Sequence, residues 1–160
     1  MIDATSIRAH QHAAGARGGQ GLQALGRSCG GFSSKIHAKV DALGMPINFA
    51  LSAGECHDSR FSETLWNEED CDFMIADRGY DDDGFRAKLI NHHIEPVIPG
   101  KKNRLIPVEY DKHVYKERNS IERFFNKIKH FRRIATRYDK TSIMFMGSLI
   151  MVGILIWLKL

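Results

Sequence analysis

Residues 72–100 read DFMIADRGYDDDGFRAKLINHHIEPVIPG, and three elements follow one another within them. DFMIAD (72–77) has the pattern of a compact apolar strand that ends in an acid. DDDGFRAKLINHH (81–93) is typical of a helix, and its acidic first turn suits the helix dipole. IEPVIPG (94–100) predicts a short strand closed by a proline and a glycine. A strand, a helix and a strand in this order predict an α/β domain.

The residues before this stretch predict an antiparallel start to the sheet. MIDATSIRAH (1–10) alternates apolar and polar residues, as a strand does. Residues 32–54 predict a β-hairpin, because FSSKIHAKV and INFALSAG flank the turn sequence LGMP. The glycine-rich segment 11–31 between them is predicted to be a loop. SRFSETLWNEE (59–69) predicts a short helix that begins at a serine cap.

Two helices are predicted after residue 100. A basic loop, KKNRLIPVEY (101–110), precedes a long helix over 111–130. The apolar segment 141–159 predicts the last helix, and 17 residues from Ser142 to Leu158 carry no charge. A membrane-spanning helix needs about 20 apolar residues. A membrane anchor is therefore the alternative, and a helix buried against the domain is favoured. The whole chain, 1–160, is predicted to be one domain with a mixed sheet and helices on both faces.

Charge is distributed unevenly along the 160 residues, whose net charge is +4. Residues 1–100 contain 9 Lys/Arg and 14 Asp/Glu, whereas residues 101–140 contain 13 Lys/Arg and 5 Asp/Glu. A basic stretch of this density indicates a polyanionic partner such as nucleic acid, and a solvated, lysine-rich helix face is the alternative. The three cysteines match no zinc pattern, and no secretory signal begins the chain. These features predict a cytoplasmic protein with reduced thiols.

Two aspartates are candidate metal ligands because of where they lie in the predicted sheet. Asp3 is on the first strand, and Asp77 closes the apolar strand of residues 72–77. The carboxyl ends of strands are where open α/β sheets usually place their sites. For Asp77 the alternative is a turn residue, or the cap of the helix that follows.

The helix over 111–130 adds a third acid. With about 100° of rotation per residue, four polar side chains fall within a stripe about 60° wide: Tyr115, Arg118, Glu122 and Lys129. This stripe borders the apolar face of the helix. The alternative is an exposed ion pair between Arg118 and Glu122, which are four residues apart. That alternative does not explain why the tyrosine and the lysine share the stripe.

Three carboxylates on two strands and one helix predict phosphoryl-transfer chemistry. Hard divalent cations such as Mg²⁺ and Mn²⁺ take carboxylate oxygens together with water and substrate phosphate. Two such ions about 3.5–4 Å apart can activate an attacking oxygen and stabilise a leaving one at phosphorus. Basic side chains would then hold the phosphates of DNA. The candidates for that role are Arg118, Lys129, Lys101, Lys102, Arg104, Arg132 and Arg133.

The spacing Tyr115-x2-Arg118-x3-Glu122-x6-Lys129 resembles the Y-R-E-K pattern of DDE transposases from bacterial insertion sequences, in the IS-four/IS-five branch. ADRGYD (76–81) is similar to that family's motif around its second acid. IDATSIRAH and the run GRSCGGFSSKIHAKVDALGMPI (26–47) are also similar to it. The resemblance extends over nearly the whole chain.

The resemblance implies a ribonuclease-H-like fold in which Asp3, Asp77 and Glu122 are the catalytic triad and bind two Mg²⁺ or Mn²⁺ ions. It implies nicking at the ends of the element and transfer of the 3′-hydroxyl to target DNA. Tyr115 would join the basic residues in contacting DNA near the cut. The implied partners are terminal inverted repeats, target DNA and further copies of the enzyme, in a bacterial cytoplasm at the nucleoid.

The sequence departs from the family pattern in two places. Only two residues precede Asp3, so the first strand is predicted to be truncated and the N-terminal DNA-binding region to be absent. The chain thus resembles the downstream frame of an enzyme split over two reading frames. The 44 residues between Asp77 and Glu122 leave no room for the large β insertion of some relatives, so no hairpin-forming cleavage is inferred. The alternative function is an inactive fragment that binds DNA or transposase as an inhibitor or relic.

Overall fold

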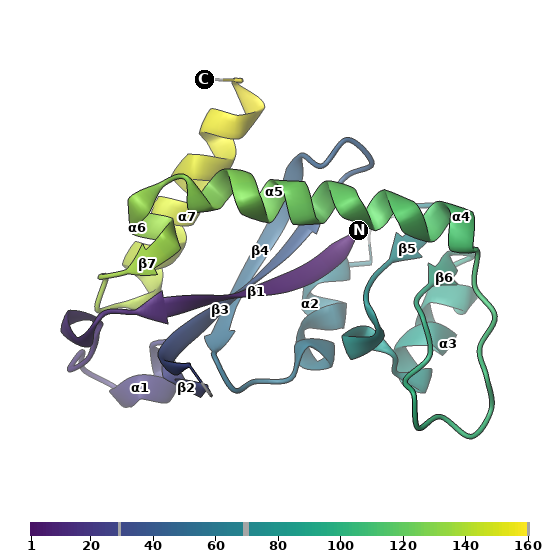
Figure 1. The fold of residues 1–160 in the computed structure, drawn as a ribbon, viewed down its shortest axis with the longest axis horizontal. Coiled ribbons are helices and arrows are strands. Elements are labelled where there is room, and N and C mark those ends of the chain that lie inside the picture. Colours follow the sequence, from purple (N-terminus) through teal and green to yellow (C-terminus); the bar gives the residue numbers. More distant parts are fainter. Residues whose placement is uncertain (29, 69–70, 160) are drawn as a thin grey trace.

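The main sheet is built around β3, which has partners on both edges (Figure 1). The computed structural model describes residues 1–28, 30–68 and 71–159. Within these residues the sheet has five strands: β1 (Ile2–Ala9), β2 (Gly26–Ser28), β3 (Gly31–Val40), β4 (Pro46–Ala53) and β7 (Thr136–Arg137). β1 lies antiparallel along one edge of β3, and β4 and β2 lie along the other. β7 is parallel to the far end of β1, which makes the sheet mixed.

The β3–β4 hairpin confirms the prediction for 32–54, and its register decides which side chains share a face. Ala38 of β3 pairs with Asp3 of β1 and with Phe49 of β4. Directly paired residues in antiparallel strands point to the same face. Asp3 therefore lies on the face of Ile36 and Val40, which are buried, and not on the opposite face with His37.

One continuous helical run crosses this face of the sheet (Figure 1). It consists of α4 (Lys112–Tyr115), the 3-10 turn η4 (Lys116–Arg118) and α5 (Asn119–Lys129), so the predicted helix over 111–130 is confirmed. Asp111 caps its start, because one carboxylate oxygen accepts the backbone N–H groups of His113 and Val114 at 2.6 and 3.1 Å. A short helix, α6 (Arg132–Ala135), follows it.

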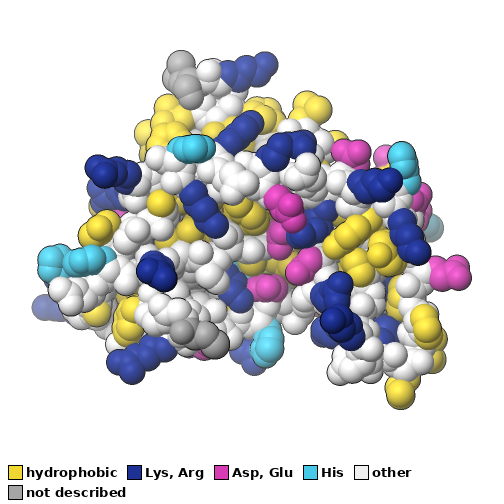
Figure 2. Space-filling view, viewed as in Figure 1, with side chains coloured by type: hydrophobic (Ala, Val, Ile, Leu, Met, Phe, Trp, Pro, Cys, Tyr) yellow, Lys and Arg dark blue, Asp and Glu magenta, His cyan; other side chains and the backbone are white. Residues whose placement is uncertain are grey.

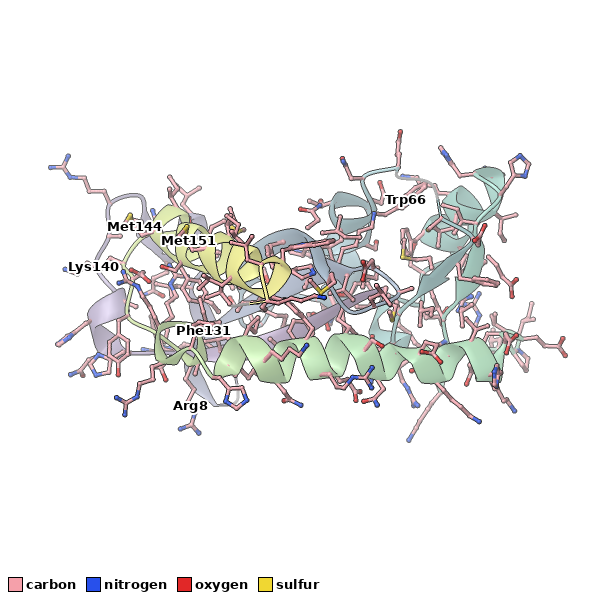
Figure 3. The ribbon with its side chains drawn as sticks, turned by 90° about the horizontal axis from the view of Figure 1, so that it is seen from above. Arg8, Trp66, Phe131, Lys140, Met144 and Met151 are labelled. Atoms are coloured by element: carbon pink, nitrogen blue, oxygen red, sulfur yellow. The ribbon has the colours of Figure 1, made fainter. Side chains whose placement is uncertain are left out.

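The last helix, α7 (Ser142–Trp157), packs beside α5 on the same face of the sheet. Its inner side joins a core of apolar residues from β1, β3, α5 and α7: Ile7, Ile36, Ala38, Val40, Ile121, Phe124, Phe125, Ile128, Phe145, Leu149 and Val152. The prediction of a helix buried against the domain is thus confirmed for this side. Met144 and Met151, labelled in Figure 3, are each 59% exposed. In the described part of the chain, no helix is both long and apolar enough to cross a membrane.

The segment between β4 and α4 shares a second core with the opposite face of the main sheet. It contains the 3-10 turn η2 (Asp58–Phe61), α2 (Ser62–Trp66), β5 (Phe73–Ile75), the 3-10 turn η3 (Arg78–Tyr80), α3 (Asp83–Asn91) and β6 (Glu95–Val97). Leu65 and Trp66 of α2 share a second core with Ile2 and Ala50 of the main sheet. Helices therefore lie on both faces, as predicted.

One prediction about the strands needs correction. The sequence predicted one sheet, but β5 and β6 pair with each other, in parallel, in a separate two-stranded sheet. Within the described residues, β5 packs near β1 through side chains of the second core and not through a backbone ladder. β1 spans eight residues and pairs with β3 from Ile2 to Arg8, and its truncation relative to the family pattern stays a prediction.

The glycine-rich segment 11–31 is not only a loop. It contains the 3-10 turn η1 (Gln11–Ala13), the helix α1 (Gly19–Leu22) and the strand β2. Ala24 anchors it, because its carbonyl oxygen accepts hydrogen bonds from Ser34 Oγ at 2.6 Å and Arg137 Nη1 at 3.2 Å. These partners are distant in the sequence, so tertiary contacts override the local preference for a loop.

Candidate active site

Asp3, the second residue of β1, lies beneath the helical run, and only 12% of its side chain is exposed. Its Oδ1 accepts the backbone N–H of Ala4 at 2.8 Å, and its Oδ2 accepts Nη1 of Arg118 at 2.7 Å. Burial raises the pKa of Asp3 to about 6 against the opposing effects of Ala4 and Arg118, and the charges of Asp77 and Asp58 raise it further. A carboxyl group in this environment gains more from a nearby cation than an exposed one does.

Arg118 joins the first and third acids of the predicted triad. Its Nη1 donates to Asp3, and its Nη2 donates to Glu122 Oε1. The predicted ion pair between Arg118 and Glu122 is therefore present, and the same guanidinium group also reaches β1. Asp3 and Glu122 lie on two sides of one positive charge, although they are far apart in the sequence. The Glu122 side chain is half-exposed, which leaves it accessible from solvent.

Asp77 follows β5 and caps the 3-10 turn η3, where its Oδ1 accepts the backbone N–H of Gly79 at 2.7 Å. Of the two alternatives, the turn residue is present, because the helix that follows, α3, is capped by Asp82. The charge of Asp77 also acts on the other residues of the site. It raises the pKa of Asp3, and it adds to the effect of burial, which raises the pKa of Tyr115. Asp77 forms no ion pair with any residue that the structure describes.

The charges of all three carboxylates act on Arg118, but the carboxylates do not converge on one point. Among residues 1–28, 30–68 and 71–159, no group of three or more His, Cys, Asp or Glu side chains could hold a metal ion. Arg118 lies between Asp3 and Glu122 instead. The donor chemistry nevertheless fits a hard divalent cation, because Mg²⁺ is usually held by one or two carboxylates and completes its shell with water and substrate phosphate.

The other residues of the predicted stripe differ in their distance from the acids. The guanidinium carbon of Arg118 lies 6.0 Å from the centre of the Tyr115 ring, so Tyr115 borders the acids. Lys129 is exposed about 10 Å further along the helix axis from Glu122. Figure 2 shows acidic side chains gathered near the middle of the face that α5 crosses, with basic side chains on either side. A polyanion on this face would meet both kinds of charge.

Some of the basic residues predicted to bind DNA are exposed, whereas others form ion pairs with aspartates. Lys101, Lys102 and Arg132 are exposed. Arg104 Nη1 instead binds Asp81 Oδ1 at 2.9 Å, and its Nη2 binds Asp83. Arg133 pairs with Asp139. Arg104 therefore anchors the loop between β6 and α4.

Asp81 is the buried centre of that anchor, a role the sequence analysis missed. It accepts Nε of Arg86 at 2.9 Å and the backbone N–H of Lys101 at 2.8 Å, in addition to Arg104. Burial alone would raise the pKa of Asp81, but these hydrogen bonds hold it below its usual range. The run of three aspartates in residues 81–83 predicted only a favourable helix start. No sequence pattern distinguished the buried aspartate from its exposed neighbours.

Asp58 and Tyr80 also border the site and were not predicted. Asp58 begins η2, which packs against η3, the turn that contains Tyr80. Tyr80 is fully buried, and its hydroxyl has no hydrogen-bond partner among the described residues. The sequence motif of residues 76–81 includes Tyr80, but the surroundings of its side chain are known only from the fold.

Gly79 gives a direct test of the position of Asp77. A Cβ at Gly79 would lie 2.8 Å from Asp77 Oδ1, so Gly79→Ala must displace that carboxylate. We expect the DNA cleavage that the family resemblance implies to fall about a hundredfold, as for other small displacements of a catalytic group. The unfolding free energy should change by less than about 1 kcal/mol, because a flexible side chain can move aside. Cleavage rates and urea unfolding measure the two effects.

The matched control is Gly147→Ala, because a Cβ at Gly147 would have no neighbour within 4 Å. This variant should retain the cleavage rate of the unmodified chain. Equal rates for Gly79→Ala and Gly147→Ala would contradict a catalytic position for Asp77.

Two comparisons with known proteins find significant similarity. A family model described as "Transposase DDE domain" matches residues 1–155. The chain is 38% identical over 130 residues to a protein of Brucella ovis (strain ATCC 25840 / 63/290 / NCTC 10512) named "Putative transposase for insertion sequence element IS6501". That alignment covers 79% of this chain and 99% of the relative. No solved structure shows significant similarity to the chain.

Proposed function

Because the chain belongs to the DDE transposases of insertion sequences, we propose that it cuts DNA at the ends of such an element and joins the freed 3′-hydroxyl to target DNA. The family acts on DNA in transposition and generally uses divalent metal ions. The observation that carries the proposal is the pair of hydrogen bonds from Arg118 to Asp3 and Glu122, with the charge of Asp77 acting on Asp3. A ribonuclease-H-like fold is part of the proposal. Its support is the antiparallel β1–β3–β4 order and the helices on both faces.

In this proposal Asp3, Asp77 and Glu122 hold Mg²⁺ or Mn²⁺. Bound ions would lower the barrier by activating the attacking oxygen and stabilising the leaving one. The residues of the chain would orient the carboxylates and bind phosphate. β1 and the Gly79 amide orient the two aspartates, and the first turn of α5 presents the glutamate from the opposite side. Arg118 offers a charge with two donor groups, which suits a phosphate as well as a carboxylate.

Exposed groups beside the acids would bind the DNA backbone. Lys129 lies along α5, and Tyr115 lies next to Arg118. Lys101 and Lys102 lie on the loop between β6 and α4, and Arg132 begins α6. Contacts of this kind make binding weaker as the salt concentration rises. Recognition of terminal inverted repeats through a DNA-binding region encoded upstream, and action as a homo-oligomer, stay predictions.

The experiment that tests the proposal is a cleavage assay with DNA that carries the terminal repeats flanking the coding sequence. The chain is assayed alone and fused to the segment encoded upstream, with Mg²⁺, with Mn²⁺ and with a chelator. We expect nicks at the repeat ends and strand-transfer products only when a divalent cation is present. DNA binding without cleavage by either protein would contradict the proposal and favour the inactive, DNA-binding fragment.

A further inference from the structure

We propose that Asp58 is a fourth carboxylate of the cation site, held beside Asp77 by Lys35, and that it increases the affinity of the site for divalent cations. The inference rests on the proposed function, because it concerns the same site. It extends the site beyond the triad by a residue from η2.

Gly79 provides the geometric evidence. A Cβ placed on Gly79 would lie 2.8 Å from Asp77 Oδ1 and 3.5 Å from Asp58 Oδ2. The two carboxylate oxygens therefore face the same small space, which is open only because residue 79 has no side chain. Two negative charges that border the same space repel each other, and a cation bound there would relieve the repulsion.

Lys35 fixes the orientation of Asp58 without using both of its oxygens. Lys35 Nζ donates to Asp58 Oδ1 at 2.8 Å and to the carbonyl oxygen of Cys56 at 2.7 Å. The Lys35 and Asp58 side chains are only 14% and 27% exposed, so the pair is partly withdrawn from solvent. Oδ2, the oxygen that faces Asp77, is not the one that Lys35 binds. An ion pair with a purely structural role would not require this second oxygen to point at another acid.

Tyr80 is an independent indication that something binds here. Its side chain is fully buried, and its hydroxyl has no hydrogen-bond partner among the residues that the structure describes. Burial raises the pKa of Tyr80, and the charges of Asp58, Asp3 and Asp77 raise it further, with the largest of these three effects from Asp58. An unpaired buried O–H beside three carboxylates is costly. It becomes satisfied when it donates to a cation-bound water or to a phosphate oxygen.

The test is an electron paramagnetic resonance titration of free Mn²⁺ with the full chain, in the absence of DNA. Asp58→Asn keeps an oxygen for Lys35 but removes the charge, and it should weaken Mn²⁺ binding about tenfold. Lys35→Met leaves the charge of Asp58 uncompensated, and it should strengthen binding about threefold. Glu63→Gln is the matched control, because Glu63 is an exposed acid of α2 that pairs with Lys88. It should bind Mn²⁺ as the unmodified chain does.

The opposite effects expected of Asp58→Asn and Lys35→Met on Mn²⁺ affinity distinguish a role in cation binding from a purely structural role. If the pair only stabilises the fold, Asp58→Asn and Lys35→Met both lower the unfolding midpoint and neither strengthens Mn²⁺ binding, which overturns the inference. If Asp58→Asn does not fold, tighter binding by Lys35→Met supports the inference and unchanged binding overturns it.

Asp77→Asn distinguishes this inference from the function on which it rests. Loss of Mn²⁺ binding in Asp77→Asn, with normal binding in Asp58→Asn, overturns the inference and leaves the proposed function standing. Normal binding in both variants overturns the proposed cation site as well.

Discussion

Replacing Glu122 with glutamine is expected to reduce DNA cleavage about a thousandfold. Glutamine keeps the length of the side chain and an oxygen that can accept a hydrogen bond from Arg118, but it removes the charge that would hold a divalent cation. The half-exposed side chain lies in the first turn of α5, away from the apolar core. Stability should therefore change by less than about 0.5 kcal/mol. Single-turnover cleavage rates with Mg²⁺ and with Mn²⁺, together with thermal unfolding, measure the two quantities.

Glu117→Gln is the control for this substitution. Glu117 lies on η4, in the same helical run, and is also exposed. Its removal changes the net charge of the chain by the same amount as Glu122→Gln, and the cleavage rate should stay within about twofold of the unmodified chain. A Glu122→Gln rate within the same range would remove Glu122 from the site and leave only its ion pair with Arg118.

The local sequence pattern was sufficient to predict most of the helices and strands. The β3–β4 hairpin follows from alternation of apolar and polar residues, and the run from α4 to α5 follows from apolar residues at helical spacing. Both patterns arise because one face of the element is buried, so they can be read without knowing the partner. β2 had no such pattern, because only its pairing with β3 makes that glycine-rich segment extended.

The sequence supplied candidate residues for the site but not their contacts. Spacing on one helix grouped Arg118 with Glu122, and no local rule could add Asp3 to them. Arg104 and Arg133 looked like free cations in a basic segment, yet each is paired with an aspartate. An ion pair between distant residues depends on how the helices and strands pack. The number of charged residues in a segment carries no information about that packing.

Arg137→Met is expected to lower the unfolding free energy by about 4 kcal/mol. Arg137 is fully buried at the end of β7, under the ring of Phe145 at 5.1 Å. Its guanidinium donates to Ser34 Oγ at 2.7 Å, to the Ala24 carbonyl at 3.2 Å and to the Asp139 carbonyl at 2.9 Å. Methionine fills much of the same volume but donates no hydrogen bond, so two backbone carbonyls lose a buried donor. Urea unfolding followed by far-UV circular dichroism measures the loss.

Arg132→Met is the control that separates the effect of losing a buried arginine on stability from the effect of losing a positive charge. Arg132 is five residues earlier, it is exposed, and its removal changes the net charge by the same amount. That variant should stay within about 0.5 kcal/mol of the unmodified chain. A similar result for Arg137→Met would mean that β2, β7 and α7 are held together by apolar packing alone. The predicted difference follows because Arg137 connects the segment before β2 to the start of α7, and no other described side chain donates to both Ala24 and Asp139 carbonyls.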